Sequence, residues 1–306
     1  MANAPLVPAA DPRGGVLRML AASMGFAAMA LCISLAHRRE PGLSTHMSSF
    51  VRAVVNTLAL LPLAGFDRRR LLGDGRMALW VRGLSGGAAL GTYFAALPRI
   101  GMGEAAFLNQ TSAVWVAALA PSVLGEPSRA VVWIAIAASL VGMGLLGHPR
   151  EGGSDAVGRL LGAVSGLAAA SAYLSVRRAS QSNGPVAIVF YFTFTASLIS
   201  GGLAWLSGAS LPADAVTAAL LVAAGLLATV AQLWMTEAYR RAPAALASAT
   251  AAAGPFLSTL LGIGFLGQVP DALGWVGMGV LGVAAIAIPL LTGAAQAPKI
   301  ASPPPS

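Results

Sequence analysis

Ten apolar stretches, each close to 20 residues long, follow one another along this chain. They cover residues 16–36, 44–65, 78–97, 103–124, 129–147, 158–178, 185–206, 215–238, 243–266 and 271–292. A helix of about 20 apolar residues is long enough to cross the hydrocarbon core of a bilayer. Only 10% of the residues are charged, whereas soluble domains average about 25%. The pattern predicts an all-α integral membrane protein with ten transmembrane helices, and a lipid bilayer as its surroundings.

The two ends of the chain differ from these apolar stretches. Residues 1–15, rich in Ala and Pro, are expected to form a disordered tail, and residues 292–306 a C-terminal tail. The first apolar stretch is interpreted as a retained helix rather than a signal peptide. It lacks a clear small-x-small cleavage site, and another apolar stretch follows it.

Basic residues between the stretches predict the orientation, because cytoplasmic loops carry an excess of Lys and Arg. With the N-terminus inside, twelve such residues are cytoplasmic and five lie on the other side. The twelve are Arg13, Arg18, Arg68, Arg69, Arg70, Arg76, Arg129, Arg177, Arg178, Arg240, Arg241 and Lys299; the five are Arg38, Arg39, Arg99, Arg150 and Arg159. We therefore expect a multi-pass protein of the bacterial inner membrane with both termini in the cytoplasm. Since the basic residues are scattered over short loops, the net charge of +8 does not indicate nucleic-acid binding.

The chain also repeats itself at an offset of 142 residues. The triplet LGE at 124–126 returns as LGQ at 266–268, and Trp133 is matched by Trp275. Further agreements at this offset are Ser23 with Ser165, Phe50 with Phe192 and Arg99 with Arg241.

The offset divides the chain into two five-helix repeats, residues 16–147 and 158–291. Because five is odd, the second repeat enters the membrane from the opposite side. The result is an inverted repeat, an arrangement found in many secondary transporters, which rock two halves around a central site.

A five-helix unit repeated twice, with LGE closing the fourth helix and LGQ the ninth, resembles the EamA-type transporters of the drug/metabolite transporter superfamily. The segment YFAALPRIGMGEAAFL at 93–108 is similar to the hairpin between the third and fourth helices of that family, and MTEAYRRAPAALASAT at 235–250 is its counterpart. The resemblance covers residues 16–291. It implies a carrier of small solutes, often an exporter, whose third, fourth, eighth and ninth helices line much of a cavity.

The chain departs from the family pattern in its fourth and ninth helices. The family usually has a proline midway along both; here the ninth has Pro255, a candidate gating residue, but the fourth has Ala113. Gln268 replaces an acid that is common in the second closing triplet. The first and sixth helices carry no acid, so the resemblance does not support expulsion of cationic drugs by proton exchange.

Two charged residues of the predicted helices are candidates for a role in the central cavity. Arg52 is about eight residues into the second helix, and Glu104 opens the fourth from the same side. Charges in the bilayer are costly and are often functional. We expect Arg52 to face the central cavity and either pair with Glu104 or meet an anionic group of the substrate. The alternative is that Arg52 snorkels to the outer interface.

Polar and aromatic residues at membrane depth are further candidates for the cavity, because they need hydrogen-bond partners there. The cavity candidates besides Arg52 are Tyr93, Asn109, Gln110, Tyr173, Tyr191, Gln232 and Trp234. The alternatives are bonds between helices for the amides, and packing or interface positions for the aromatic residues.

Three other charged residues are interpreted as structural. Glu126, in the turn between the fourth and fifth helices, is expected to accept backbone hydrogen bonds or to pair with Arg129. Glu237 is expected to pair locally with Arg240 and Arg241, and Arg82 to snorkel inward.

Glycines at four-residue spacing predict close helix contacts in lipid, where association depends on tight packing. Gly83, Gly87 and Gly91 form one such stripe, and Gly158, Gly162 and Gly166 another. Both stripes are expected to be tight helix crossings.

Metal, cofactor and catalytic sites are not predicted. Cys32 is the only cysteine, and His37, His46 and His148 lack the spacing of metal ligands. The sequence contains no P-loop, so ATP is not expected to drive transport directly. No pattern typical of a catalytic triad or of paired carboxylates is convincing, which argues against an enzyme.

The sequence thus predicts a secondary transporter of a small organic metabolite, amino acid-like or otherwise uncharged or zwitterionic, with export by alternating access. One alternative is facilitator-type uptake of a metabolite or vitamin, and another is a non-transporting membrane scaffold or sensor. Substrate identity, proton coupling and a homodimer are left open.

Overall fold

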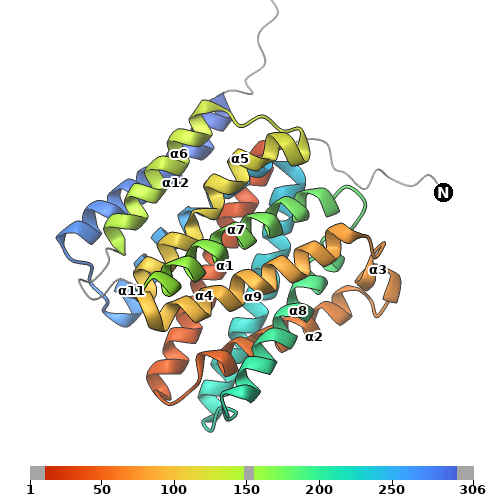
Figure 1. Ribbon diagram of the computed structural model, residues 1–306, viewed down its shortest axis with the longest axis vertical. Coiled ribbons are helices and arrows are strands. Elements are labelled where there is room, and N and C mark those ends of the chain that lie inside the picture. The colour runs from red at the N-terminus through yellow and green to blue at the C-terminus, as the bar shows by residue number, and fades with distance from the viewer. Residues whose placement is uncertain (1–10, 148–154, 295–306) are drawn as a thin grey trace, which may run out of the picture.

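The computed structural model describes residues 11–147 and 155–294. All regular structure in these residues is helical, as the sequence predicts, and the helices pack into one bundle (Figure 1). Six helical segments of the described chain have the length and hydropathy to cross a membrane: Pro12–Arg39, Glu104–Leu124, Ala156–Ala179, Pro185–Leu206, Ala215–Arg241 and Ala244–Leu266. Two shorter apolar helices accompany them, Ala130–Leu146 and Ala272–Ala287.

The helices of the described residues are, in chain order, α1 (Pro12–Arg39), α2 (Thr45–Leu63), α3 (Arg68–Leu72), α4 (Met77–Gln110), α5 (Ser112–Leu124), α6 (Ala130–Leu146), α7 (Ala156–Ala179), α8 (Pro185–Leu206), α9 (Ala215–Arg241), α10 (Ala244–Ala251), α11 (Ala253–Leu266) and α12 (Ala272–Ala294).

The first helix begins earlier than predicted because Asp11 caps it. The Asp11 carboxylate accepts a hydrogen bond of 2.9 Å from the amide of Gly14, which satisfies a free donor of the first turn. The predicted disordered tail over residues 1–15 is therefore wrong from Asp11 onward, and its first ten residues lie outside the described chain. The predicted C-terminal tail is likewise too long, because α12 continues to Ala294; the rest of that tail is also outside the described residues.

The chain reverses its direction within α4, at Gly101. This glycine has φ 79° and ψ 165°, a backbone conformation that favours glycine. Before it, α4 runs antiparallel to α7, so that Arg99 contacts Asp155 near the start of α7. After it, the chain returns along α7, and Leu108 packs on Gly162. Thus α4 contains the predicted third helix and the beginning of the fourth.

The predicted fourth and ninth helices are each interrupted by a single residue. Thr111 separates α4 from α5 with φ −59° and ψ −13°, and Ala252 separates α10 from α11 with φ −62° and ψ −12°. Thr111 Oγ1 donates to the Leu108 carbonyl at 2.6 Å, a bond that competes with the helical ladder. Pro255 has no amide hydrogen to donate to the carbonyl of Ala251. Both helices are interrupted, although only the second has a proline close to its interruption.

Helices from the first part of the chain pair with helices from the second. The main pairs are α1 with α9, α4 with α7, α2 with α8, and α6 with α12. Figure 1 shows α6 and α12 along one edge of the bundle, and α2 and α8 along the opposite edge. The interface between the two parts therefore runs through the middle of the molecule.

Both glycine stripes lie at tight helix crossings, as predicted. A Cβ added at Gly83 would lie 2.7 Å from the Tyr191 carbonyl oxygen, and one at Gly166 would lie 2.6 Å from that of Leu108. The contact loosens at the end of the first stripe, because a Cβ at Gly91 would meet no atom closer than 3.6 Å. Small residues thus let the backbones of α4, α7 and α8 approach closely.

Charged contacts gather at the two ends of the bundle. At one end, Arg177 forms an ion pair with Glu126, the Ser182 hydroxyl donates to Asp74, and the Asp11 backbone amide donates to the Arg241 carbonyl. At the other end are three ion pairs: Arg39 with Asp214, Arg99 with Asp155, and Arg159 with Glu104. A hydrogen bond from the Gly158 amide and the nearby Arg99 guanidinium lower the pKa of the Asp155 carboxyl. The acids of these ends thus cap helices or pair with arginines, which keeps the charges outside the apolar middle.

Candidate functional site

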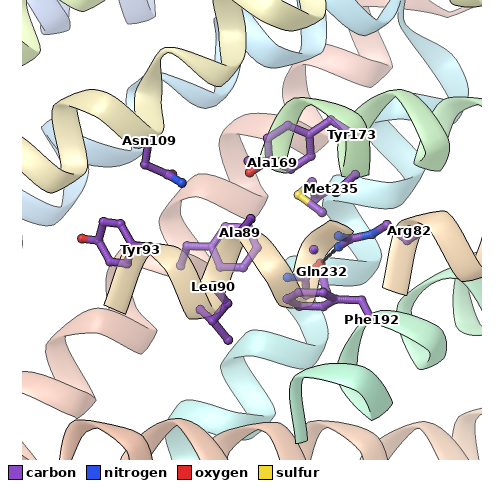
Figure 2. Close-up of a pocket in the computed structure, with 13 residues that line it drawn as sticks. Arg82, Ala89, Leu90, Tyr93, Asn109, Ala169, Tyr173, Phe192, Gln232 and Met235 are labelled. Atoms are coloured by element: carbon purple, nitrogen blue, oxygen red, sulfur yellow. Dashed lines mark hydrogen bonds between the residues drawn. The ribbon is translucent and has the colours of Figure 1, made fainter. Parts of the chain in front are cut away.

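A cavity of about 300 Å³ lies between α1, α4, α7, α8 and α9. Both parts of the chain contribute to its wall, and Figure 2 shows the side chains that face it. The lining residues are Phe26, Arg82, Gly86, Ala89, Leu90, Tyr93, Asn109, Ala169, Ala172, Tyr173, Phe192, Gln232 and Met235.

Arg82 is the charged residue of this cavity and is only 2% exposed. Its Nη2 donates a hydrogen bond of 3.1 Å to Gln232 Oε1, on α9. Its Cζ lies 4.2 Å from the centroid of the Phe192 ring, on α8, which is a cation–π contact. Its Nε is buried without a hydrogen-bond partner. The prediction that Arg82 snorkels to the inner interface is therefore wrong: three helices hold the guanidinium inside the bundle.

Tyr173 lines the cavity with its aromatic ring and packs against a second tyrosine on the side away from the cavity. Its ring stacks on that of Tyr239, with centroids 5.5 Å apart and planes inclined by 16°. The hydroxyl of Tyr239 shares a hydrogen bond of 2.8 Å with Ser248 on α10. Because Tyr239 is fully buried and anchored, it fixes the face that Tyr173 turns to the cavity.

Asn109 and Tyr93 lie at the other end of the cavity from Arg82 (Figure 2). Asn109 Nδ2 donates to Ser165 Oγ at 3.1 Å, and Ser165 Oγ donates to the Gly162 carbonyl at 2.7 Å. The amide of Asn109 is thereby oriented by α7, two residues before the interruption at Thr111. The cavity thus has one cationic end and one end with neutral polar groups.

The electrostatics of the cavity are one-sided. Arg82 is the one charged side chain among its lining residues, and none of them is acidic. The remaining wall is mostly aromatic or aliphatic, with the polar groups of four further side chains, Tyr93, Asn109, Tyr173 and Gln232. Ligand sites typically combine such an apolar wall with a few placed polar groups.

Half of the predicted cavity residues line this cavity. They are Tyr93, Asn109, Tyr173 and Gln232, which come from three different helices. The structure brings Gln232 to Arg82 although 150 residues separate them in the chain.

Arg52 does not behave as predicted. It does not pair with Glu104, which bonds instead to Arg159, and it is not among the residues that line the cavity. Snorkelling is excluded as well, because only 7% of Arg52 is exposed. Its Nη1 points to the sulfur of Met29 at 3.9 Å, one turn of α1 beyond Phe26 of the cavity.

Three other candidates also lie away from the cavity. Trp234 is 43% exposed on the outer surface of α9. The hydroxyl of Tyr191 donates to the Leu72 carbonyl at 3.2 Å, beside the edge-on ring of Trp80. Gln110 is partly buried but does not line the cavity, since it follows Asn109 by a rotation of 100° around the helix.

Two of the three acids for which the sequence suggests a pairing, Glu104 and Glu126, pair with other residues than expected. Glu104 accepts a hydrogen bond of 2.7 Å from Arg159 Nε. Glu126 pairs not with Arg129 but with Arg177, at 2.6 Å, and also accepts the backbone amide of Ala244 at 2.9 Å. Sequence proximity suggested Arg129, whereas the tertiary structure places the ends of α7 and α9 over the turn.

The third acid makes the predicted contacts. Glu237 is paired with Arg240 at 2.5 Å and with Arg241 at 3.2 Å, one helical turn along α9. Pro255 lies in the first turn of α11, next to the interruption at Ala252, and does not line the cavity.

The lining residues that the sequence did not assign to the cavity include Arg82, Phe26, Phe192 and Met235. Aromatic and methionine residues in apolar helices carry no signal of their own. Arg82 does carry a signal, because a charge in an apolar stretch is costly and is often functional. Its position near the start of the predicted helix, however, also suits snorkelling to the interface.

A second cavity of about 800 Å³ lies at the end of the bundle where α4 begins and α7 ends. Arg76, Arg178 and Asn183 are among its lining residues. Beside it, burial would raise the pKa of the Asp74 carboxyl, but hydrogen bonds from the Ser182 hydroxyl and the Arg76 amide outweigh this and lower the pKa. Among the described residues, no cluster of three or more His, Cys, Asp or Glu is suited to hold a metal ion.

A family model matches almost the whole chain. The model of the EamA-like transporter family matches residues 13–147 and, a second time, residues 156–290. The two matches divide the chain close to the boundary that the 142-residue offset predicts.

Proteins of known name are similar to this chain over most of their length. The pseudopaline exporter CntI of Pseudomonas aeruginosa strain UCBPP-PA14 is 30% identical over 277 residues, which are 90% of this chain and 96% of that protein. A riboflavin transporter of Rhizobium johnstonii is 31% identical over 204 residues, which are 63% of this chain and 64% of that protein. One crystal structure superposes with a TM-score of 0.75 at 19% identity, covering 90% of this chain and 99% of the other, and shows that the fold is shared.

Proposed function

The chain belongs to the EamA-like transporter family, and from that premise we propose that it is a secondary transporter of a small organic metabolite. The metabolite is amino acid-like or otherwise uncharged or zwitterionic, and we infer export across the bacterial inner membrane by alternating access. The observation that carries this proposal is the cavity of about 300 Å³ between helices from both parts of the chain. A site at the interface of two repeats is where such transporters bind their substrates.

We propose ten membrane crossings in two inverted repeats, residues 16–147 and 158–291. The helix pairs support this arrangement: under the 142-residue offset, the pair α1 and α9 corresponds to the pair α7 and α4. The pairs α2 with α8 and α6 with α12 each join equivalent helices. The interruptions at Thr111 and Ala252 also lie within one residue of that offset.

We propose that both termini are cytoplasmic. The residues assigned to the cytoplasmic side by the distribution of basic residues meet at one end of the bundle, where the Asp11 amide bonds to the Arg241 carbonyl. Those assigned to the other side also meet one another, as Arg99 does with Asp155. This grouping supports a single, consistent orientation for every proposed crossing.

The direction of transport draws support from the named relatives. The similarity to a pseudopaline exporter favours export. The similarity to a riboflavin transporter favours a vitamin as a second candidate substrate, which facilitator-type uptake would also accommodate. A scaffold or sensor without transport activity receives less support, because the named relatives are an exporter and a transporter.

Reconstitution into liposomes tests the proposed function. We expect saturable counterflow for at least one solute in a panel of radiolabelled amino acids and riboflavin, above that of protein-free liposomes. Repeating the measurement with an imposed pH gradient tests proton coupling: accumulation against a gradient indicates a secondary transporter, and equilibration alone indicates a facilitator. A panel without any saturable flux would contradict the proposal.

Replacing Asn109 with leucine is expected to lower transport of that solute about fivefold. The variant removes a polar group of the cavity and its bond to Ser165, and one hydrogen bond contributes about 1 kcal/mol, a factor of about five. The matched control is Gln110→Leu, the neighbouring amide, which does not line the cavity. We expect the control to stay within about twofold of the wild-type rate. Equal losses in both variants would disprove the assignment of Asn109 to the site.

A further inference from the structure

The guanidinium of Arg82 lies in the cavity without a compensating negative charge. Only 2% of Arg82 is exposed, and in the described chain no carboxylate pairs with it. Gln232 is the residue that accepts a hydrogen bond from it, and its Nε has no partner at all. Other arginines at the ends of the bundle have acids within 4 Å, such as Arg177 and Arg159. Arg82 and Arg52 are both buried without such an acid in the described chain, and of these two only Arg82 lines the cavity.

An uncompensated cation at this depth is costly. Taking a charge out of water costs several kcal/mol unless an opposite charge and hydrogen bonds replace its hydration. The face of Phe192 and the amide oxygen of Gln232 supply only part of this compensation. An unsatisfied buried donor such as Nε is rare in native proteins and calls for an explanation. A bound anionic group would supply both the charge and the acceptor.

Resting on the proposed transport function, we propose that Arg82 binds a carboxylate of the transported solute. A guanidinium presents planar N–H donors that match a carboxylate. A phosphate dianion fits less well, because Arg82 is the one cationic side chain among the lining residues. The solute thus carries a carboxylate that faces Arg82, and among the solutes of the proposed function an amino acid-like zwitterion meets this condition.

The rest of the cavity defines the rest of the solute. Its volume of about 300 Å³ lies at the lower end of the range for ligand sites, so the solute is compact. Tyr93 lies eleven residues after Arg82 on α4, which separates their Cα positions by roughly 16 Å along the helix. The aromatic rings of Phe26 and Tyr173 also line the cavity. The solute class is therefore a small carboxylate with an apolar or aromatic body.

Matched probes test this assignment in the purified full-length protein. The probes are 3-phenylpropionate, its uncharged analogue 3-phenylpropionamide, and phenethyl phosphate, each titrated by calorimetry in detergent. We expect the wild type to bind the carboxylate at least about tenfold more tightly than the amide, as for a charge-assisted bond of about 1.5–3 kcal/mol, and more tightly than the phosphate. In Arg82→Gln the carboxylate and the amide should bind within about twofold of each other.

The controls separate charge recognition from folding. Arg159→Gln removes an arginine from the end of the bundle and should keep the wild-type preference for the carboxylate. Arg82→Lys keeps the positive charge and should prefer the carboxylate over the amide, but less strongly than the wild type does. This variant provides the test if Arg82→Gln does not fold. Equal or absent binding of carboxylate and amide by the wild type, tighter binding of the phosphate, or an unchanged preference in Arg82→Gln would each overturn the assignment. Counterflow without carboxylate preference would overturn only this inference and leave the transport function standing.

Discussion

Replacing Gly277 with valine is expected to separate α12 from α6 and to lower the stability of the protein by about 3 kcal/mol or more, beyond the usual cost of overpacking of about 1–3 kcal/mol. A Cβ at Gly277 would lie 2.5 Å from the Gly142 carbonyl oxygen and 2.8 Å from the Leu146 amide nitrogen. Both atoms belong to the backbone, so no side-chain rotation relieves the clash. In lipid, water exclusion does not hold two helices together, and the lost contact has no substitute.

The matched control is Gly279→Val, two residues further along the same helix. A Cβ at Gly279 would meet no atom within 4 Å, while the change in helix propensity is the same in both variants. Thermal melting in detergent, followed by intrinsic fluorescence, compares the two. We expect a large fall in melting temperature for Gly277→Val and almost none for Gly279→Val. Similar melting temperatures would show that the close approach of α6 and α12 does not stabilise the fold.

Replacing Arg177 with methionine is expected to lower stability by about 2–3 kcal/mol, less than the roughly 3–5 kcal/mol for a fully buried ion pair, because solvent screens part of the interaction. Arg177 Nε bonds to Glu126 at 2.6 Å, and the two side chains are 24% and 21% exposed. Arg177 Nη1 also donates to the carbonyls of Tyr239 and Arg240 at 3.0 and 2.8 Å, where α9 ends. The variant would leave Glu126 unpaired and two terminal carbonyls without their cation.

The neighbouring residue provides the control for that variant. Arg178 is exposed at the end of α7, so Arg178→Met should change the melting temperature little. Glu126→Gln should destabilise the protein as Arg177→Met does, although less, because an amide can still accept from Arg177. If Arg177→Met melted at the temperature of Arg178→Met, the contact between the LGE turn and α9 would not contribute to stability.

The glycine stripes and the local ion pairs could be predicted because their geometry is set within a helix. Residues four apart lie on one face, so Gly158, Gly162 and Gly166 had to form one surface, and Glu237 had to meet Arg241. The repeated triplet, LGE in the first repeat and LGQ in the second, located two equivalent turns. They did not reveal that only Glu126 clamps the ends of two other helices.

The candidate site was predicted only in half, and the reason is the rotation of the helices. In a water-soluble protein, a polar stripe tells which face of a helix is exposed. Here both lipid and protein interior are apolar, so Asn109 and Gln110 look equivalent in the sequence although Asn109 alone lines the cavity. Trp234 and Gln232 differ in the same way on α9.

The sequence by itself determined that this chain forms apolar helices, where most of them lie, and that it repeats at an offset of 142 residues, because length, hydropathy and residue identity are local properties. Only the tertiary structure decided which arginine enters the cavity. Arg52 and Arg82 both lie in apolar helices, but the packing of α4 against α8 and α9 buries Arg82 between Phe192 and Gln232. That choice depends on contacts 110 and 150 residues away along the chain, which no local pattern encodes.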